Sequence, residues 1–150
     1  MKKCFTLLEI LVVLVIVVVI SAVGWPALNR WQSGSFLSTS AEQITSSTRL
    51  AQVNSQNGFD NKQIGLKLFE DKIIIFQGDN YNNRTITDDK EIILQKGISL
   101  AWQLNYNNDE IVFSKNKGLP SQTGLLVLTG NDKEAQISIN EIGLIDLVMN

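Results

Sequence analysis

The 150-residue chain is long enough for one modest domain, and its composition excludes several classes of active site. It has no histidine and one cysteine, Cys4, so a Ser-His-Asp triad, a Cys-His pair, a His-ligated zinc site and an internal disulfide are excluded. We therefore expect no enzymatic activity, cofactor or metal, and the net charge of −2 without a long basic cluster predicts no nucleic-acid partner.

The chain begins with a long apolar segment. Every residue from 10 to 20 is Ile, Leu or Val. As a helix, residues 5–28 would measure about 36 Å, which is enough to cross a bilayer. The pair Lys2-Lys3 precedes the segment and no basic cluster follows it directly, which predicts a single pass with a cytoplasmic N-terminus. A secretory signal peptide is the alternative, with residues 21–25 as a loose cleavage site.

Glu9 is an unusual residue at the leading edge of this apolar segment. A central acid costs about 2.5–3.5 kcal/mol on membrane-insertion scales, and an acid near the end of the span costs less. Two interpretations are open from the residues alone. The carboxylate either reaches back to the cytoplasmic headgroups, or it is neutralised by a cation from another subunit.

Gly24 and Pro26 lie further along the same segment. Both residues disfavour a soluble helix, but a membrane helix tolerates them because neighbouring helices satisfy the freed backbone groups. We predict a kink or a loosened turn over residues 21–26 instead of a helix end.

Helical periodicity continues through residues 29–58 and indicates an amphipathic half that needs a partner surface. Asn57-Gly58 is a helix stop, since glycine readily adopts the left-handed cap. One helix of about 50 residues is therefore predicted. The expected apolar stripe consists of Leu37, Ala41, Ile44, Thr48 and Ala51, widened by Leu50 and Val53.

From residue 62 onward the apolar period changes to two, which predicts short antiparallel strands joined by turns. Trp102 lies on one of these strands and is expected in the core. The expected strands are Gln63–Glu70, Lys72–Gln77, Glu91–Gln95, Ile98–Leu104, Glu110–Ser114, Gly124–Thr129, Ala135–Asn140 and Leu144–Val148.

Residues 78–89 form the longest expected loop. Its acids could offer oxygen ligands to calcium, but the segment lacks an EF-hand pattern, which favours a polar surface loop.

The N-terminal residues carry a resemblance to a known family. Lys-Lys-Cys-Phe-Thr-Leu-Leu-Glu followed by an aliphatic run resembles the class III signal of type IV pilins and pseudopilins. The resemblance implies that a prepilin peptidase cuts between Cys4 and Phe5 and methylates the amine of Phe5. It also implies that Glu9 pairs with the N-terminal amine of a neighbouring subunit, and that Pro26 matches the proline where these helices loosen. Cys4 departs from the family's usual glycine, which predicts slower cleavage or a more permissive peptidase.

The C-terminal part has weaker similarity to the same family. Arg49-Leu-Ala-Gln, Glu110-Ile-Val-Phe with Gly118, the run from Gly124 and the segment 136–143 resemble minor pseudopilins of the GspH/FimT type. The implied fold class is α+β and pilin-like: a long N-terminal transmembrane helix, then an antiparallel β-rich domain packed on its C-terminal half.

The expected parts are a leader at residues 1–4, a transmembrane and assembly half at 5–28, an amphipathic half at 29–58 and a β-rich domain at 59–150. The implied function is that of a minor subunit of a type II secretion pseudopilus. The implied partners are other pilin subunits, the prepilin peptidase, an inner-membrane assembly platform and the lipid bilayer, with the C-terminal domain periplasmic or extracellular. Two alternatives stay open, namely a minor pilin of a type IV or competence pilus and an anchored binding domain that never polymerises.

Overall fold

A computed structural model describes residues 7–58, 61–106, 108–130 and 133–149, with the side chains of 23–34 left out. The expectations for Cys4 and Phe5 lie outside this set. The chain divides into two compact units, Met1–Ser33 and Gly34–Asn150.

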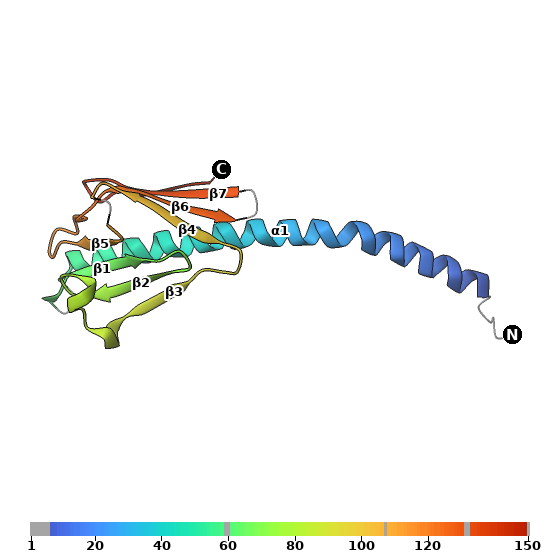
Figure 1. The fold of residues 1–150 in the computed structure, drawn as a ribbon, viewed down its shortest axis with the longest axis horizontal. Helices are drawn as coiled ribbons and strands as arrows, with labels where there is room; N and C mark the ends of the chain where they lie inside the picture. Colours follow the sequence, from blue (N-terminus) through green and yellow to red (C-terminus); the bar gives the residue numbers. More distant parts are fainter. Residues whose placement is uncertain (1–6, 59–60, 107, 131–132, 150) are drawn as a thin grey trace. The chain divides into compact units, whose positions relative to one another are not determined.

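The helix α1 is assigned over Leu7–Gln56 and belongs in part to each unit (Figure 1). Its C-terminal end confirms the stop predicted from sequence. The Asn57 amide donates to the Val53 carbonyl at 2.9 Å, and Gly58 then adopts a φ of 64°. This left-handed conformation favours glycine, because a Cβ atom there meets the backbone.

All eight strands predicted from the two-residue period are present in the second unit, with ends shifted by at most two residues. The predicted loop 78–89 is confirmed as irregular apart from two short 3-10 helices. The elements are β1 (Ile64–Leu68), β2 (Lys72–Gln77), η2 (Tyr81–Asn83), η3 (Ile86–Asp88), β3 (Lys90–Ile93), β4 (Ser99–Leu104), β5 (Glu110–Phe113), β6 (Gly124–Gly130), β7 (Lys133–Ile139) and β8 (Ile145–Met149).

The strands form two four-stranded antiparallel sheets, a division that the sequence pattern did not predict. The first sheet has the order β3-β2-β1-β5, and the second has the order β4-β6-β7-β8. The chain therefore leaves the first sheet after β3, enters the second with β4, and returns with β5. The alternation of apolar and polar residues along a strand is the same whether the strands form one sheet or two. It therefore could not predict which strands belong to which sheet.

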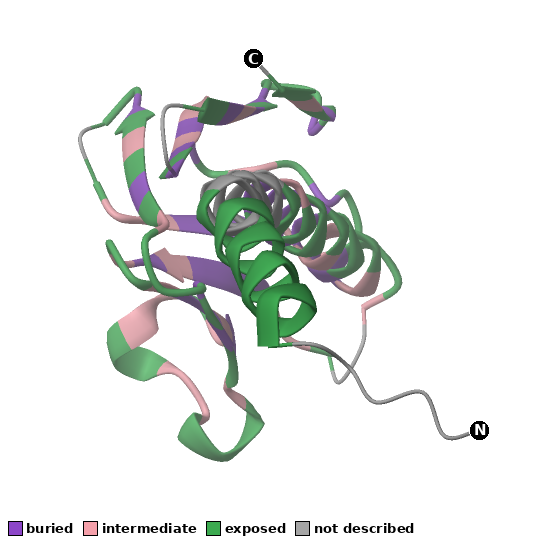
Figure 2. Ribbon diagram, turned by 90° about the vertical axis from the view of Figure 1, so that its right-hand side faces the viewer, coloured by how far each residue is buried: buried purple, intermediate pink, exposed green. Residues whose placement is uncertain are grey.

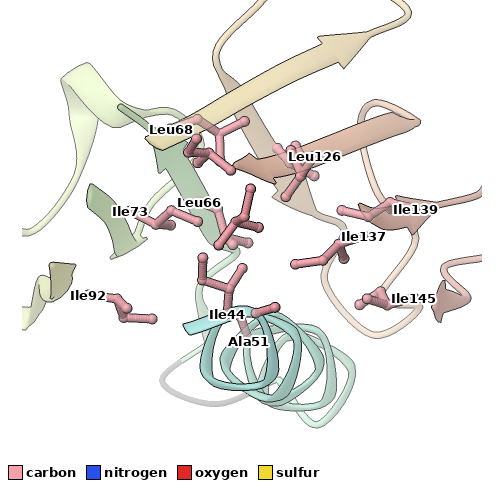
Figure 3. Packing of buried hydrophobic residues seen from close by; sticks show 14 of the residues in the cluster. Ile44, Ala51, Leu66, Leu68, Ile73, Ile92, Leu126, Ile137, Ile139 and Ile145 are labelled. Atoms are coloured by element: carbon pink, nitrogen blue, oxygen red, sulfur yellow. The ribbon is translucent and has the colours of Figure 1, made fainter. Parts of the chain in front are cut away.

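The two sheets and α1 enclose one core. Figure 3 shows Leu66 and Ile73 of the first sheet facing Ile137 of the second, with Ile44 and Ala51 of α1 closing the remaining side. Each of these five side chains is less than 5 % exposed. Leu37, Ala41 and Thr48 are equally buried, so the predicted helical stripe is confirmed at these positions.

The predicted widening of that stripe was wrong. Leu50 is 53 % exposed at the edge of the first sheet, and Val53 is 45 % exposed, because the sheets do not extend far enough around α1 to cover them. Small polar residues are instead buried within this face and beside it. Thr45 donates its hydroxyl to the Ala41 carbonyl at 2.8 Å, and Ser55 donates to the Phe113 carbonyl at 2.7 Å. Their hydroxyls are thereby satisfied inside the core.

The outer face of the first sheet carries a second apolar layer. The Phe76 ring lies over Gly65 on the neighbouring strand, where a Cβ atom would collide with it. Tyr81, in the loop 78–89, packs edge-on against Phe76 with ring centroids 5.7 Å apart. The loop thus covers a sheet face that would otherwise expose its apolar residues. Trp102, on the other sheet, is partly buried against the main core, in line with the sequence expectation.

Candidate functional site

Within the first unit, residues 7–22 of α1 present an apolar helical surface on all sides. Every described side chain from Leu7 to Ala22 is exposed, and in Figure 2 this part of α1 is green throughout. Glu9 is the acid in its first turn. The Ser21 hydroxyl donates to the Val17 carbonyl at 2.7 Å, so its polar group is satisfied within the helix. An apolar helical surface of this extent is typical of a segment that packs against a partner.

Among the residues with described side chains, none lies in a helix that is long and apolar enough to span a membrane. The predicted span 5–28 also includes residues outside that set, so it stays a prediction. Gly24 and Pro26 lie within α1, and the loosened turn expected there likewise stays a prediction.

Polar side chains on the C-terminal turns of α1 bind backbone carbonyls of both sheets. The Arg49 guanidinium donates to the Ile145 carbonyl at 2.7 Å. The Gln52 amide donates to the carbonyls of Gly143 at 2.8 Å and Gly118 at 3.1 Å. With the bond from Ser55 to β5, this set anchors α1 to the end of β5, the 117–118 turn and the start of β8. We call Arg49, Gln52 and Ser55 the carbonyl latch.

Two glycines allow glutamines of α1 to approach the turns that the carbonyl latch binds. Gly143 has a φ of 81°, and a Cβ atom built there would overlap the Gln52 amide. Gly118 has a φ of 63°, and a Cβ atom there would overlap the side chain of Gln56. Glycine is therefore required at both positions for two reasons. It adopts the left-handed backbone conformation, and its missing Cβ atom leaves room for a glutamine of α1. The resemblance to minor pseudopilins includes both glycines but gives no reason for them.

The loop 78–89 is held by ion pairs. Arg84 stacks on the Tyr81 ring with its guanidinium carbon 3.7 Å from the centroid, and its Nε lies 2.7 Å from the Asp89 carboxylate. This hydrogen bond raises the pKa of Arg84 above its ordinary value. Lys62 lies 3.7 Å from Asp88. Among the described residues, no three acidic, histidine or cysteine side chains gather as a metal site, and these two acids pair with cations.

An open polar groove runs over the outer side of β5. It encloses about 710 Å³ and is bordered by Asp79, Glu110, Lys117 and the exposed Tyr106. The buried Gln122 side chain forms part of its floor and donates to the Glu110 carbonyl at 2.7 Å.

Sequence reasoning found some of these residues and missed others. Through a family likeness it singled out Arg49, Gln52 and the segment that ends at Gly143, but not the contacts that join them across 96 and 91 positions. It missed Ser55 altogether. The available signal was the spacing Arg49, Gln52, Gln56, since positions i, i+3 and i+7 share one helix face.

The fold is α+β and is similar to that of pilin-like proteins. No protein-family model and no curated protein matches the sequence. Among solved structures, the minor pseudopilin EpsH from the Type 2 Secretion System of Vibrio cholerae is similar, with a TM-score of 0.60 and 12% sequence identity. The similarity covers 75% of this chain and 96% of that one. At this identity, the comparison shows a shared fold.

Proposed function

We propose that the chain is a prepilin-type pseudopilin, a minor structural subunit of a type II secretion pseudopilus. The observation that carries the proposal is the combination of a pilin-like fold with Glu9 in the first turn of an all-round apolar helix. The helical surface of residues 7–22 suits packing against lipid before assembly and against other subunits' helices afterwards. The β-rich unit then forms the outer layer of the filament.

The N-terminal residues supply the chemistry of assembly in this proposal. Prepilin peptidase cuts between Cys4 and Phe5 at the cytoplasmic face of the inner membrane and methylates the new amine of Phe5. The Glu9 carboxylate then pairs with the amine of a neighbouring subunit. Ion pairs strengthen at low dielectric, so the contact offsets the cost of burying Glu9 and fixes the axial register between helices.

Mass spectrometry of the mature protein from native cells tests the processing step. We expect a chain that begins at Phe5 and carries one methyl group on its amine. A Cys4→Gly variant should be cut at least as fast, because glycine is the usual residue of the family at this position. A mature chain that retains Met1 would contradict the proposal.

A further inference from the structure

We propose that the β-rich units of successive copies of this chain interlock, with the β7–β8 turn of one copy inserted beside α1 of the next. This inference rests on the proposed filament function and deepens it, because it assigns the contact and a second copy as the partner. It also places more than one copy in each filament. The two contacting surfaces lie within the second unit, Gly34–Asn150.

The first surface is an exposed apolar turn. Ile142 is 76 % exposed and Leu144 is 60 % exposed, and they lie on either side of Gly143. We call this pair the apolar tip. Hydrogen bonds fix its backbone, since Asn140 Oδ1 accepts from the Leu144 amide at 2.7 Å and the Gly143 amide donates to the Asn140 carbonyl at 3.0 Å.

The Gln52 amide of the carbonyl latch also binds the Gly143 carbonyl, so the tip is held against α1. A flexible loop would lose conformational entropy on docking, and a fixed one loses little. The structure therefore holds two aliphatic side chains in water on a rigid support. Isolated exposed apolar residues are common on protein surfaces, but a rigid exposed pair fits an anchor at an interface.

The second surface is a small cleft between α1 and the first sheet. It encloses about 140 Å³, and its apolar lining includes Leu50, Ala51, Ile64 and Ile75. This volume is below the range of about 300–1,000 Å³ of small-molecule sites, and suits one inserted aliphatic side chain. Leu50, which the core leaves 53 % exposed, would be covered by such an insertion.

The charges beside the two surfaces are complementary. Glu141 is exposed directly before the apolar tip, and Lys90 is exposed at the border of the cleft. Asp88 also borders the cleft, but lies 3.7 Å from Lys62 of its own chain. A docked tip would bring Glu141 toward Lys90, and a pair of this kind at the edge of an interface favours the correct partner orientation.

The two surfaces lie on opposite sides of α1. The cleft uses helix positions 47, 50, 51 and 54, whereas the tip is held by positions 49 and 52. At 3.6 residues per turn, the two sets point about 180° apart around the helix axis. In Figure 3, Ile92 of β3, the strand that carries Lys90, and Ile145 of β8, the strand that follows the tip, lie on either side of α1. Because the tip and the cleft lie on opposite sides, the contact between two copies is head-to-tail. Such a contact can be repeated from copy to copy, whereas a symmetric contact would form a closed dimer.

Cysteine cross-linking of the full-length chain in membranes tests the contact. The background is Cys4→Gly, which removes the only native thiol. The double variant Ile142→Cys with Ser47→Cys should give a ladder of dimers, trimers and larger species under mild oxidation. Each single variant should stay monomeric. Equal dimer formation by Ile142→Cys alone would overturn the head-to-tail geometry.

A charge exchange provides the second arm. Glu141→Lys should reduce the double-cysteine ladder at least fivefold, and adding Lys90→Glu should restore it. Glu134→Lys, an exposed acid on β7, is the matched control and should leave the ladder unchanged. Equal loss with Glu134→Lys, or no recovery in the exchanged variant, would overturn the assigned pair.

Co-purification with other pilin subunits from the same cells separates this inference from the proposed function. A missing ladder with intact co-purification overturns the contact and leaves the pseudopilin assignment in place. A ladder without co-purification sustains the contact and overturns that assignment.

Discussion

The Arg49 guanidinium on α1 donates a 2.7 Å hydrogen bond to the backbone carbonyl of Ile145, the first residue of the edge strand β8. Edge-strand carbonyls are open to pairing with another chain unless they are blocked. The next residue contributes a similar block, since Asp146 Oδ1 accepts a hydrogen bond from the Leu147 amide at 3.0 Å. The edge of β8 is thus protected at two successive positions, and Arg49 also ties the second sheet to the helix.

Arg49→Ala should therefore destabilise the second unit by about 1 kcal/mol, because one charge-assisted hydrogen bond is lost at a site that is partly open to water. Urea unfolding of the full-length chain, followed by circular dichroism, measures this change. Glu42→Ala removes an exposed charge from the same helix and is the control, with an expected effect within about 0.5 kcal/mol. Equal effects from both variants would show that the bond to Ile145 contributes no stability.

Gly143→Ala should destabilise the chain by about 1–3 kcal/mol, since alanine there has an unfavourable left-handed backbone and overlaps the Gln52 amide. Gly97→Ala separates the two effects. Gly97 has a φ of 89°, but a Cβ atom there meets no other atom within 4 Å, so only backbone strain remains.

The double variant Gly143→Ala with Gln52→Ala then tests the overlap itself. Removing the Gln52 amide relieves the overlap, so the double variant should be more stable than the sum of the two single effects predicts. Strictly additive unfolding free energies would mean that the two side chains do not compete for space.

Ile44→Ala should cost about 2–5 kcal/mol, because Ile44 is 1 % exposed between the two sheets and its truncation leaves a cavity. Leu50→Ala, six residues along the same helix, should stay within about 0.5 kcal/mol in monomeric protein. Thermal unfolding at low protein concentration compares the two variants. A large loss from Leu50→Ala under these conditions would place that side chain in the core.

Arg84→Lys should lower the unfolding temperature, since lysine cannot at once stack flat on Tyr81 and bind Asp89. The folded-state pKa of Arg84 is raised, so its stabilising contribution is fully present below the unfolded-state pKa and is lost only in strong alkali. The difference in unfolding temperature between Arg84→Lys and the unchanged chain should thus stay constant from about pH 6 to about pH 9. A difference that disappears across this range would assign the effect to another titrating group.

The sequence predicted those features that depend on neighbouring residues. Strand positions and the helix stop at Asn57-Gly58 follow from local periodicity and from the backbone preference of glycine, and both are confirmed. The width of the buried helical face was not predictable from the apolar pattern. It depends on how far the sheets extend around α1, and they leave Leu50 and Val53 in water.

Long-range contacts were also beyond local reasoning. The division into two sheets arises from β5 returning to pair with β1, as in Ile64 opposite Phe113. The bond from Arg49 joins residues 96 positions apart, and no spacing rule connects them. At the N-terminus, the family resemblance supplied the roles of Cys4, Phe5 and Glu9, and these roles stay predictions.

Incorporation of a Glu9→Val variant into filaments tests the proposed function most directly. The variant should insert into the inner membrane as well as the unchanged chain, because valine is less costly than glutamate in a bilayer. It should be absent from sheared filaments and from complexes purified with other pilin subunits. Glu42→Val, which changes an acid of α1 within the second unit, is the matched control and should be incorporated normally. Normal incorporation of the Glu9→Val variant would contradict the assembly role of Glu9 and the account built on it.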